Sequence, residues 1–66
     1  MSVAKTIELS AISPTSFEDA IKQAIAKSGE SLRNIQGAWI KEQKVVIENG
    51  DITGFQVMLN LTFVVE

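Results

Sequence analysis

The last quarter of the sequence alternates without a break between apolar and other side chains. From residue 55 onward its odd-numbered positions are all apolar: Phe55, Val57, Leu59, Leu61, Phe63 and Val65. A period of two predicts a β-strand over residues 52–66, and it fixes the register because a slip by one residue would expose the whole apolar set. Asn49-Gly50 stands just before this strand, and both residues tolerate positive φ. The sequence therefore predicts a tight hairpin whose first strand covers residues 35–48.

The first strand of this hairpin changes its parity halfway along. Ala38 and Ile40 are apolar at even positions, whereas Val45 and Ile47 are apolar at odd positions. One residue too many must therefore lie between residues 41 and 44, and we expect a β-bulge or bend there.

A short strand and a helix precede the hairpin. Residues 3–9 alternate with period two, which indicates a half-buried strand. Ser13-Pro14-Thr15-Ser16 then provides three alternative helix caps, at Ser13, Thr15 or Ser16. The helix stripe consists of Phe17, Ala20, Ile21, Ala24, Ile25 and Leu32. We place its end near Gly29, although Leu32 keeps the phase and would allow a longer helix. The order β-α-β-β predicts an α+β domain over residues 1–66, with a three-stranded antiparallel sheet packed on one helix.

Composition excludes several classes of function. The 66 residues include no Cys and no His, which removes disulfides, Cys/His zinc sites and His- or Cys-based nucleophilic catalysis. An enzyme built from this chain would have to use Asp, Glu or Lys, and no metal-ligating residues are assigned. The net charge is −2 and the cations are spread along the chain, so we expect no nucleic-acid partner. No apolar run is long enough for a signal or a membrane span, which predicts a soluble, cytoplasmic protein without a membrane partner.

The lengths of the predicted elements do not match. A strand of about 13 residues spans roughly 40 Å, whereas a helix of about 14 residues covers roughly 20 Å. One helix cannot shelter such a hairpin, and a chain this small has little core of its own. We expect an obligate homo-oligomer whose copies cover one another. The alternative is a marginal monomer with its hairpin bent over itself.

These features together resemble the dodecin family. The resemblance covers nearly the whole chain and rests on its element order and on three segments: Ser13-x-x-Ser16-Phe17-Glu18-Asp19-Ala20-Ile21, Leu32-Arg33-Asn34-Ile35 and Gly54-Phe55-Gln56-Val57-x-Leu59-x-Leu61-x-Phe63. It implies a non-enzymatic, hollow homo-dodecamer of cubic symmetry, with helices outside and sheet faces inside. Typical members hold flavins in pairs at subunit interfaces.

The resemblance also implies which residues bind the flavin. Typical dodecins stack the isoalloxazine ring on a Trp at the start of the second strand. Reading without gaps from Leu32 puts Gly37 at that place and Trp39 two residues later, on the same strand face. Trp39 is then the candidate stacking platform, with Gly37 leaving room beside it, or else a residue packed in a subunit interface. Gln56 matches the Gln that hydrogen-bonds the ring edge.

Polar residues near the predicted bulge complete the candidate site. Lys44 stands where bacterial members often carry Arg, and Glu42-Gln43 resembles the Asp-Gln pair of an archaeal variant. Lys44, Glu42 and Gln43 would contact a ribityl or phosphate group, or serve only as polar groups at the bulge or in salt bridges between subunits. The predicted function is binding and buffering of a small planar ligand, a flavin such as riboflavin or FMN. The alternative is a flavin-free structural or cation-binding shell, in which Glu48 and Asp51 gather a cation on a symmetry axis.

Overall fold

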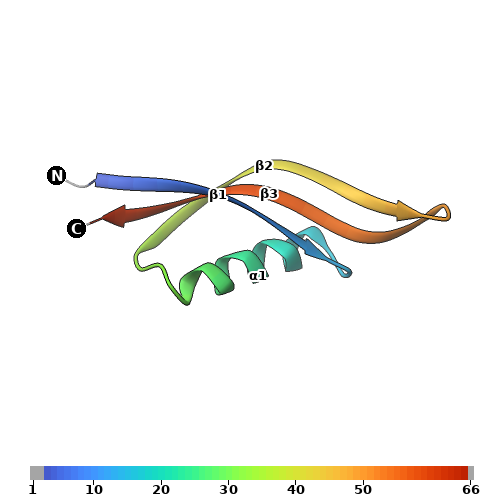
Figure 1. Cartoon of the computed structure of the whole chain (residues 1–66), viewed down its shortest axis with the longest axis horizontal. Coiled ribbons are helices and arrows are strands. Elements are labelled where there is room, and N and C mark those ends of the chain that lie inside the picture. The colour runs from blue at the N-terminus through green and yellow to red at the C-terminus, as the bar shows by residue number, and fades with distance from the viewer. Residues whose placement is uncertain (1–2, 66) are drawn as a thin grey trace.

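The computed structural model describes residues 3–65 and contains one helix and one three-stranded sheet. The elements are β1 (Val3–Ser13), α1 (Phe17–Gly29), β2 (Ile35–Glu48) and β3 (Asp51–Val65) (Figure 1). β3 lies in the middle of the sheet and pairs antiparallel with both neighbours, in the order β1-β3-β2. The predicted β-α-β-β order and antiparallel sheet are confirmed. The last residue of the strand predicted over 52–66, Glu66, lies outside the described residues.

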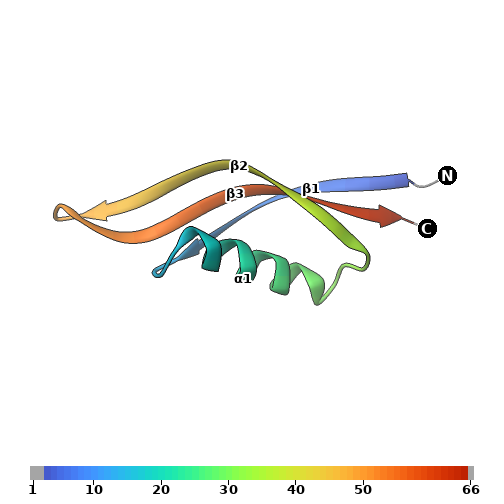
Figure 2. The ribbon, with the colours of Figure 1, turned by 180° about the vertical axis from the view of Figure 1, so that it is seen from behind.

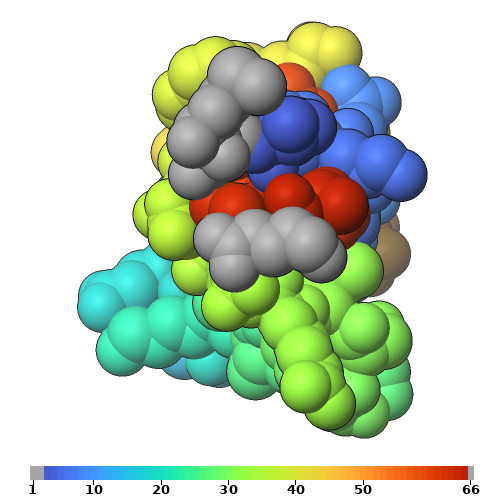
Figure 3. All heavy atoms as spheres, turned by 90° about the vertical axis from the view of Figure 1, so that its left-hand side faces the viewer, coloured from blue at the N-terminus to red at the C-terminus, as the bar shows by residue number. Residues whose placement is uncertain are grey.

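The molecule has two layers, with α1 against one face of the sheet. Figure 2 shows the helix beneath the strands from behind, and the end-on view in Figure 3 shows the two layers stacked. The buried apolar core consists of Ala20 and Ala24 of α1 with Val57, Leu59 and Leu61 of β3. Small alanines let the helix approach the central strand closely, and odd-numbered residues of β3 supply the apolar side chains, as the alternation predicts.

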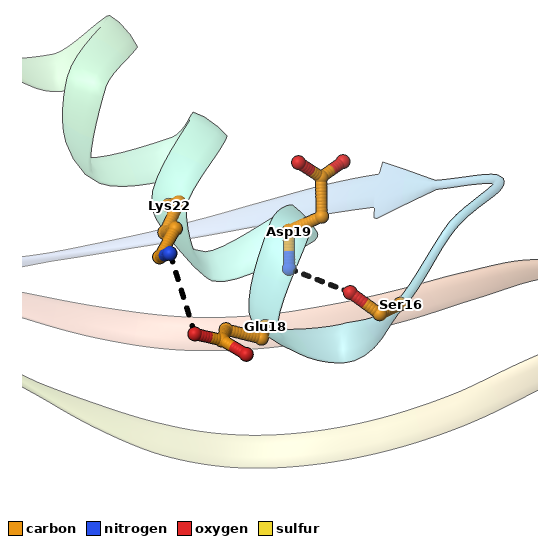
Figure 4. A network of polar contacts seen from close by, with 4 residues as sticks. All are labelled: Ser16, Glu18, Asp19 and Lys22. Atoms are coloured by element: carbon orange, nitrogen blue, oxygen red, sulfur yellow. Dashed lines mark hydrogen bonds and ion pairs between the residues drawn. The ribbon is translucent and has the colours of Figure 1, made fainter.

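The helix begins at a well-formed cap. Ser16 has extended backbone angles, and its hydroxyl accepts a hydrogen bond from the Asp19 backbone N–H at 3.0 Å (Figure 4). Glu18 and Lys22 form an ion pair on the first turn at 3.3 Å. Ser13 is fully buried, and its hydroxyl donates to Asp19 Oδ2 at 2.6 Å while accepting from the Thr15 N–H at 3.0 Å. Of the three alternative caps, Ser16 is therefore the N-cap, and Ser13 anchors the preceding turn.

The helix ends at Gly29, where it was predicted to end. Glu30 is the C-cap, and its N–H reaches the carbonyls of Lys27 and Ser28. Leu32 lies beyond the helix, so the longer alternative does not form. Ile25, assigned to the buried stripe, is 38% exposed because it lies at the edge of the face that packs on the sheet.

β1 is longer than its sequence pattern indicates. The ladder continues past Leu9, with Ser10 to Ser13 opposite Met58 to Phe55. Ala11 continues the alternation of Ile7 and Leu9 and packs against the core, and pairing with the long central strand satisfies the backbone as far as Ser13.

The hairpin has the predicted turn and the predicted bulge. Asn49 and Gly50 adopt positive φ values of 53° and 82°. Ile40 pairs with Leu59 and Glu42 pairs with Met58, which leaves Lys41 as the extra residue. Lys41 is the first residue of the range 41–44 in which the bulge was expected.

The chain is too elongated for a compact monomer. Its extents are 51 × 20 × 13 Å and its radius of gyration is 13.6 Å, whereas a compact chain of this length has about 11 Å. The accessible surface is 4806 Å², against about 4100 Å² for a compact protein of this mass. β1 stops opposite Phe55, and the hairpin continues without a third strand to its turn (Figure 1). The mismatch of lengths predicted from the sequence is therefore present.

Much apolar surface of this single chain remains uncovered. The exposed large apolar residues among those described are Val3, Ile12, Ile25, Trp39, Ile40, Ile47, Ile52 and Val65. Trp39 is the most exposed of them, at 72%. In the described part of the chain, no helix has the length and apolar character needed to cross a membrane.

Candidate functional site

The sheet has one face without a helix, which we call the open face. Because Val57, Leu59 and Leu61 point into the core, the even-numbered side chains of β3 point away from α1. The cross-strand pairs on this face are Gly37 with Thr62, Trp39 with Asn60, Glu42 with Met58 and Lys44 with Gln56. The open face thus places four of the predicted site residues along one strip of sheet: Gly37, Trp39, Lys44 and Gln56.

The bulge at Lys41 explains how Trp39 and Lys44 can share the open face. Trp39 has an odd number and Lys44 an even number, so a regular strand would place them on opposite faces. The extra residue between Ile40 and Glu42 shifts the alternation of β2 by one position, so the side chains of Trp39 and Lys44 both lie on the open face.

A shallow pocket lies beside the bulge. It encloses about 180 Å³ and is lined by Glu42, Gln43, Lys44, Gln56 and Met58. Gln56 and Met58 are half-buried, whereas the three residues of β2 are exposed. Pockets that hold drug-sized ligands usually enclose about 300–1,000 Å³. One chain therefore provides a polar, partly formed site that is too small to enclose a tricyclic ring.

Trp39 lies next to this pocket but does not line it. Its partner Asn60 and the pocket residue Met58 are two positions apart on β3, a distance of about 7 Å along the strand. Gly37 lies one pair further, and a Cβ built there would meet no atom within 4 Å. The indole and the pocket are thus neighbours on one face, with free space on the far side of the indole.

Gln43 is placed differently from the other predicted residues. It pairs with Val57, whose side chain is in the core, so alternation directs Gln43 away from the face of Lys44 and Gln56. It contributes to the pocket lining at the strand edge.

An ion pair crosses the open face and was not indicated by any short-range pattern. Lys41 Nζ donates to Glu8 Oε2 at 2.7 Å, so the bulge residue of β2 reaches over β3 to β1. The hydrogen bond to Glu8 and its negative charge raise the pKa of Lys41 above its usual 10.5, and Glu42 adds to this effect. Only the sheet order, with β1 and β2 on either side of β3, reveals that residues 33 positions apart meet.

The structure also places the carboxylates considered for a cation. Glu48 and Asp51 form the last cross-strand pair before the turn, and both are exposed. The described residues contain no group of three or more His, Cys, Asp or Glu side chains suited to a metal.

Comparisons with known proteins agree with this architecture. Residues 3–66 match the family model described as Dodecin. The chain is 30% identical over 63 residues to the calcium dodecin of Mycobacterium tuberculosis, covering 96% of this chain and 89% of that protein.

Solved dodecin structures superpose closely on this chain. A mutant dodecin from Thermus thermophilus superposes with a TM-score of 0.94 at 30% identity, covering 100% of this chain and 98% of that one. A dodecin from Streptomyces coelicolor superposes with a TM-score of 0.93 at 25% identity, covering 98% and 93% of the two chains.

Proposed function

Because the chain belongs to the dodecin family, we propose that it is a non-enzymatic protein that binds a flavin, riboflavin or FMN, between copies of itself. One observation carries this proposal: the only Trp of the chain is exposed on the open face, one cross-strand pair from a polar pocket that contains Gln56. An exposed indole costs free energy in water unless something covers it, and a flat heterocycle covers it well.

Each predicted residue has a chemical part in this binding mode. Trp39 offers its ring face for stacking, and Gly37 leaves open space where the ligand or a partner side chain approaches. The Gln56 amide both donates and accepts, which suits the alternating polar edge of a flavin. Lys44 carries a positive charge for a phosphate, and Gln43 at the strand edge offers hydrogen bonds to the ribityl chain.

The proposed site is completed by a second copy of the chain. The pocket of one chain encloses about 180 Å³, so a flavin needs further walls. The exposed apolar residues and the unsupported hairpin also need a cover. A hollow homo-dodecamer, as the family resemblance implies, would supply both by bringing open faces together at its interfaces.

The proposed role is storage without turnover. A chain without His or Cys has no side chain whose ordinary pKa lies near neutrality. The residues on the open face can hold and orient a flavin and keep water from its ring. Binding would lower the concentration of free flavin, and contact with the indole would quench its excited state.

A second candidate function follows from a relative. The Mycobacterium tuberculosis protein, 30% identical to this chain, is named a calcium dodecin. In this alternative, Glu48 and Asp51 from several copies would surround a cation where hairpin turns meet, because Ca²⁺ prefers several carboxylate oxygens.

A fluorescence titration tests the flavin proposal. Purified protein is titrated with riboflavin and with FMN while the emission of Trp39 and of the flavin is followed. We expect both emissions to fall together and to saturate at micromolar ligand. A Trp39→Leu variant should lose most of the affinity, measured by flavin emission. Unchanged flavin emission in the presence of the wild-type protein at these concentrations would refute the proposal.

Calorimetry with Ca²⁺ distinguishes the second function. The wild type and a double variant, Glu48→Gln with Asp51→Asn, are titrated with CaCl₂ in the absence of flavin. Binding that the double variant abolishes would favour the cation alternative. If the same double variant binds flavin with unchanged affinity, the flavin site and the cation site are separate.

A further inference from the structure

The bulge at Lys41 separates the two parts of the proposed flavin site. Trp39 lies two residues before Lys41, and Glu42 and Lys44 of the pocket follow it. A bulge bends its strand and increases the local twist. The angle at Lys41 therefore sets how the indole is directed relative to the pocket.

The pairing does not itself require Lys41. Ile40 is opposite Leu59 and Glu42 is opposite Met58, which is the next residue on β3. A chain without Lys41 would form a regular ladder between Gly37 and Val46, with the same pairs on both sides and the same side chains on the open face. The extra residue thus changes the local direction of β2 without changing its register.

Lys41 is held in place by an ion pair with β1, the strand at the other edge of the sheet. Its Nζ lies 2.7 Å from Glu8 Oε2, and Glu8 belongs to β1, which pairs with β3 through Glu8 and Asn60. Asn60 is also the partner of Trp39. The ion pair therefore links the bulge to the same cross-strand row that carries the indole.

We propose that Lys41 and Glu8 are positioning residues for the flavin site: their ion pair across β3 fixes the bulge, and the bulge fixes the direction of Trp39 relative to the pocket at Gln56. This inference rests on the proposed function, but its structural half is tested without any flavin.

The ligand-binding test uses the assembled protein and two ligands. Riboflavin is neutral and FMN carries a phosphate, so the pair separates positioning from direct charge contact. Lys41→Met and Glu8→Gln should each weaken both ligands by the same factor, about two- to fivefold, as expected for an exposed ion pair. Combining the two changes should weaken binding no further than either alone. Lys41→Arg, which keeps the charge and the hydrogen bond, should restore binding.

Deletion of Lys41 tests the bulge itself. We expect riboflavin binding to weaken by about tenfold, the loss of one stacking contact, while circular dichroism and the oligomer mass stay unchanged. Glu18→Gln is the matched control, because it removes another exposed ion pair far from the open face and should leave the affinity unaltered. A deletion variant that binds riboflavin as tightly as the wild type would overturn the proposal. So would a Lys41→Met variant that loses only FMN, since Lys41 would then contact the phosphate directly.

Amide hydrogen exchange tests the same ion pair in the absence of ligand. Glu8→Gln should speed exchange at residues 40–44 of β2, whereas Glu18→Gln should not. If exchange at these residues is the same in Glu8→Gln and the wild type, the positioning role is refuted whether or not flavin binds. Faster exchange together with no flavin binding by the wild type would support the fixed bulge and refute the proposed function alone.

Discussion

Ile47 and Ile52 face each other near the tip of the hairpin, beyond the end of β1. They are cross-strand partners and are 60% and 56% exposed in the single chain. Full burial of an isoleucine side chain is worth about 1.5–3 kcal/mol, so covering the exposed parts of both is worth about 2–3 kcal/mol per chain. In an assembly, this free energy comes from contact between copies.

The perturbation is the double variant Ile47→Thr with Ile52→Thr. Threonine keeps the β-branched shape that favours strands, while it removes most of the apolar gain. A loss of about 2–3 kcal/mol weakens each contact by roughly 30- to 140-fold. We expect sedimentation velocity at micromolar concentration to show dissociation of the variant at concentrations where the wild type stays assembled.

The control replaces an apolar residue on the helix. Ile25→Gln changes a side chain that is 38% exposed on α1, which the family resemblance places on the outside of the shell. Its sedimentation should match that of the wild type. If the hairpin double variant keeps its full mass across the concentration series, the tip lies outside every interface and the prediction is wrong.

Three further predictions concern single positions. Gly37→Trp should tighten riboflavin binding severalfold in a fluorescence titration, because nothing lies within 4 Å of its Cβ and the indole would add a stacking surface; an unchanged or weaker affinity would count against the assigned place of the ligand. Ser16→Ala should lower the free energy of unfolding in urea by about 1 kcal/mol, since the Asp19 N–H loses its partner, whereas Thr15→Ala should cost much less. The stabilisation from Lys41, whose pKa is raised, should be complete well below pH 10.5 and be lost as the pH rises through the raised value. The difference in urea unfolding between wild type and Glu8→Gln should therefore be full at pH 9 and shrink as the pH rises above 10.5, and a difference that stays constant would contradict the assignment.

The fold could be predicted well because its signals are local. The alternation along β3, the Asn49-Gly50 turn and the cap region around Ser16 each depend on neighbours in the sequence, and all three have the predicted structure. The end of β1 was predicted too early, because Ala11 continues the alternation but Ile12 and Ser13 break it and are held by pairing with β3.

The candidate site was predictable only in part. The change of parity between Ile40 and Val45 indicated the bulge, and the bulge brings Trp39 and Lys44 to one face. The link between Lys41 and Glu8 could not be predicted, because it depends on which strand occupies the centre of the sheet. The residues that close the pocket at Gln56 belong to other copies in this account, and no pattern within one chain identifies them.

The central claim is that one chain is an incomplete unit, and the mass of the native protein tests it most directly. Native mass spectrometry or sedimentation equilibrium at micromolar concentration should give a species of about 86 kDa, twelve times the 7.2 kDa chain. A stable 7.2 kDa monomer under these conditions would contradict the account, since neither the hairpin nor the flavin pocket would then have its cover.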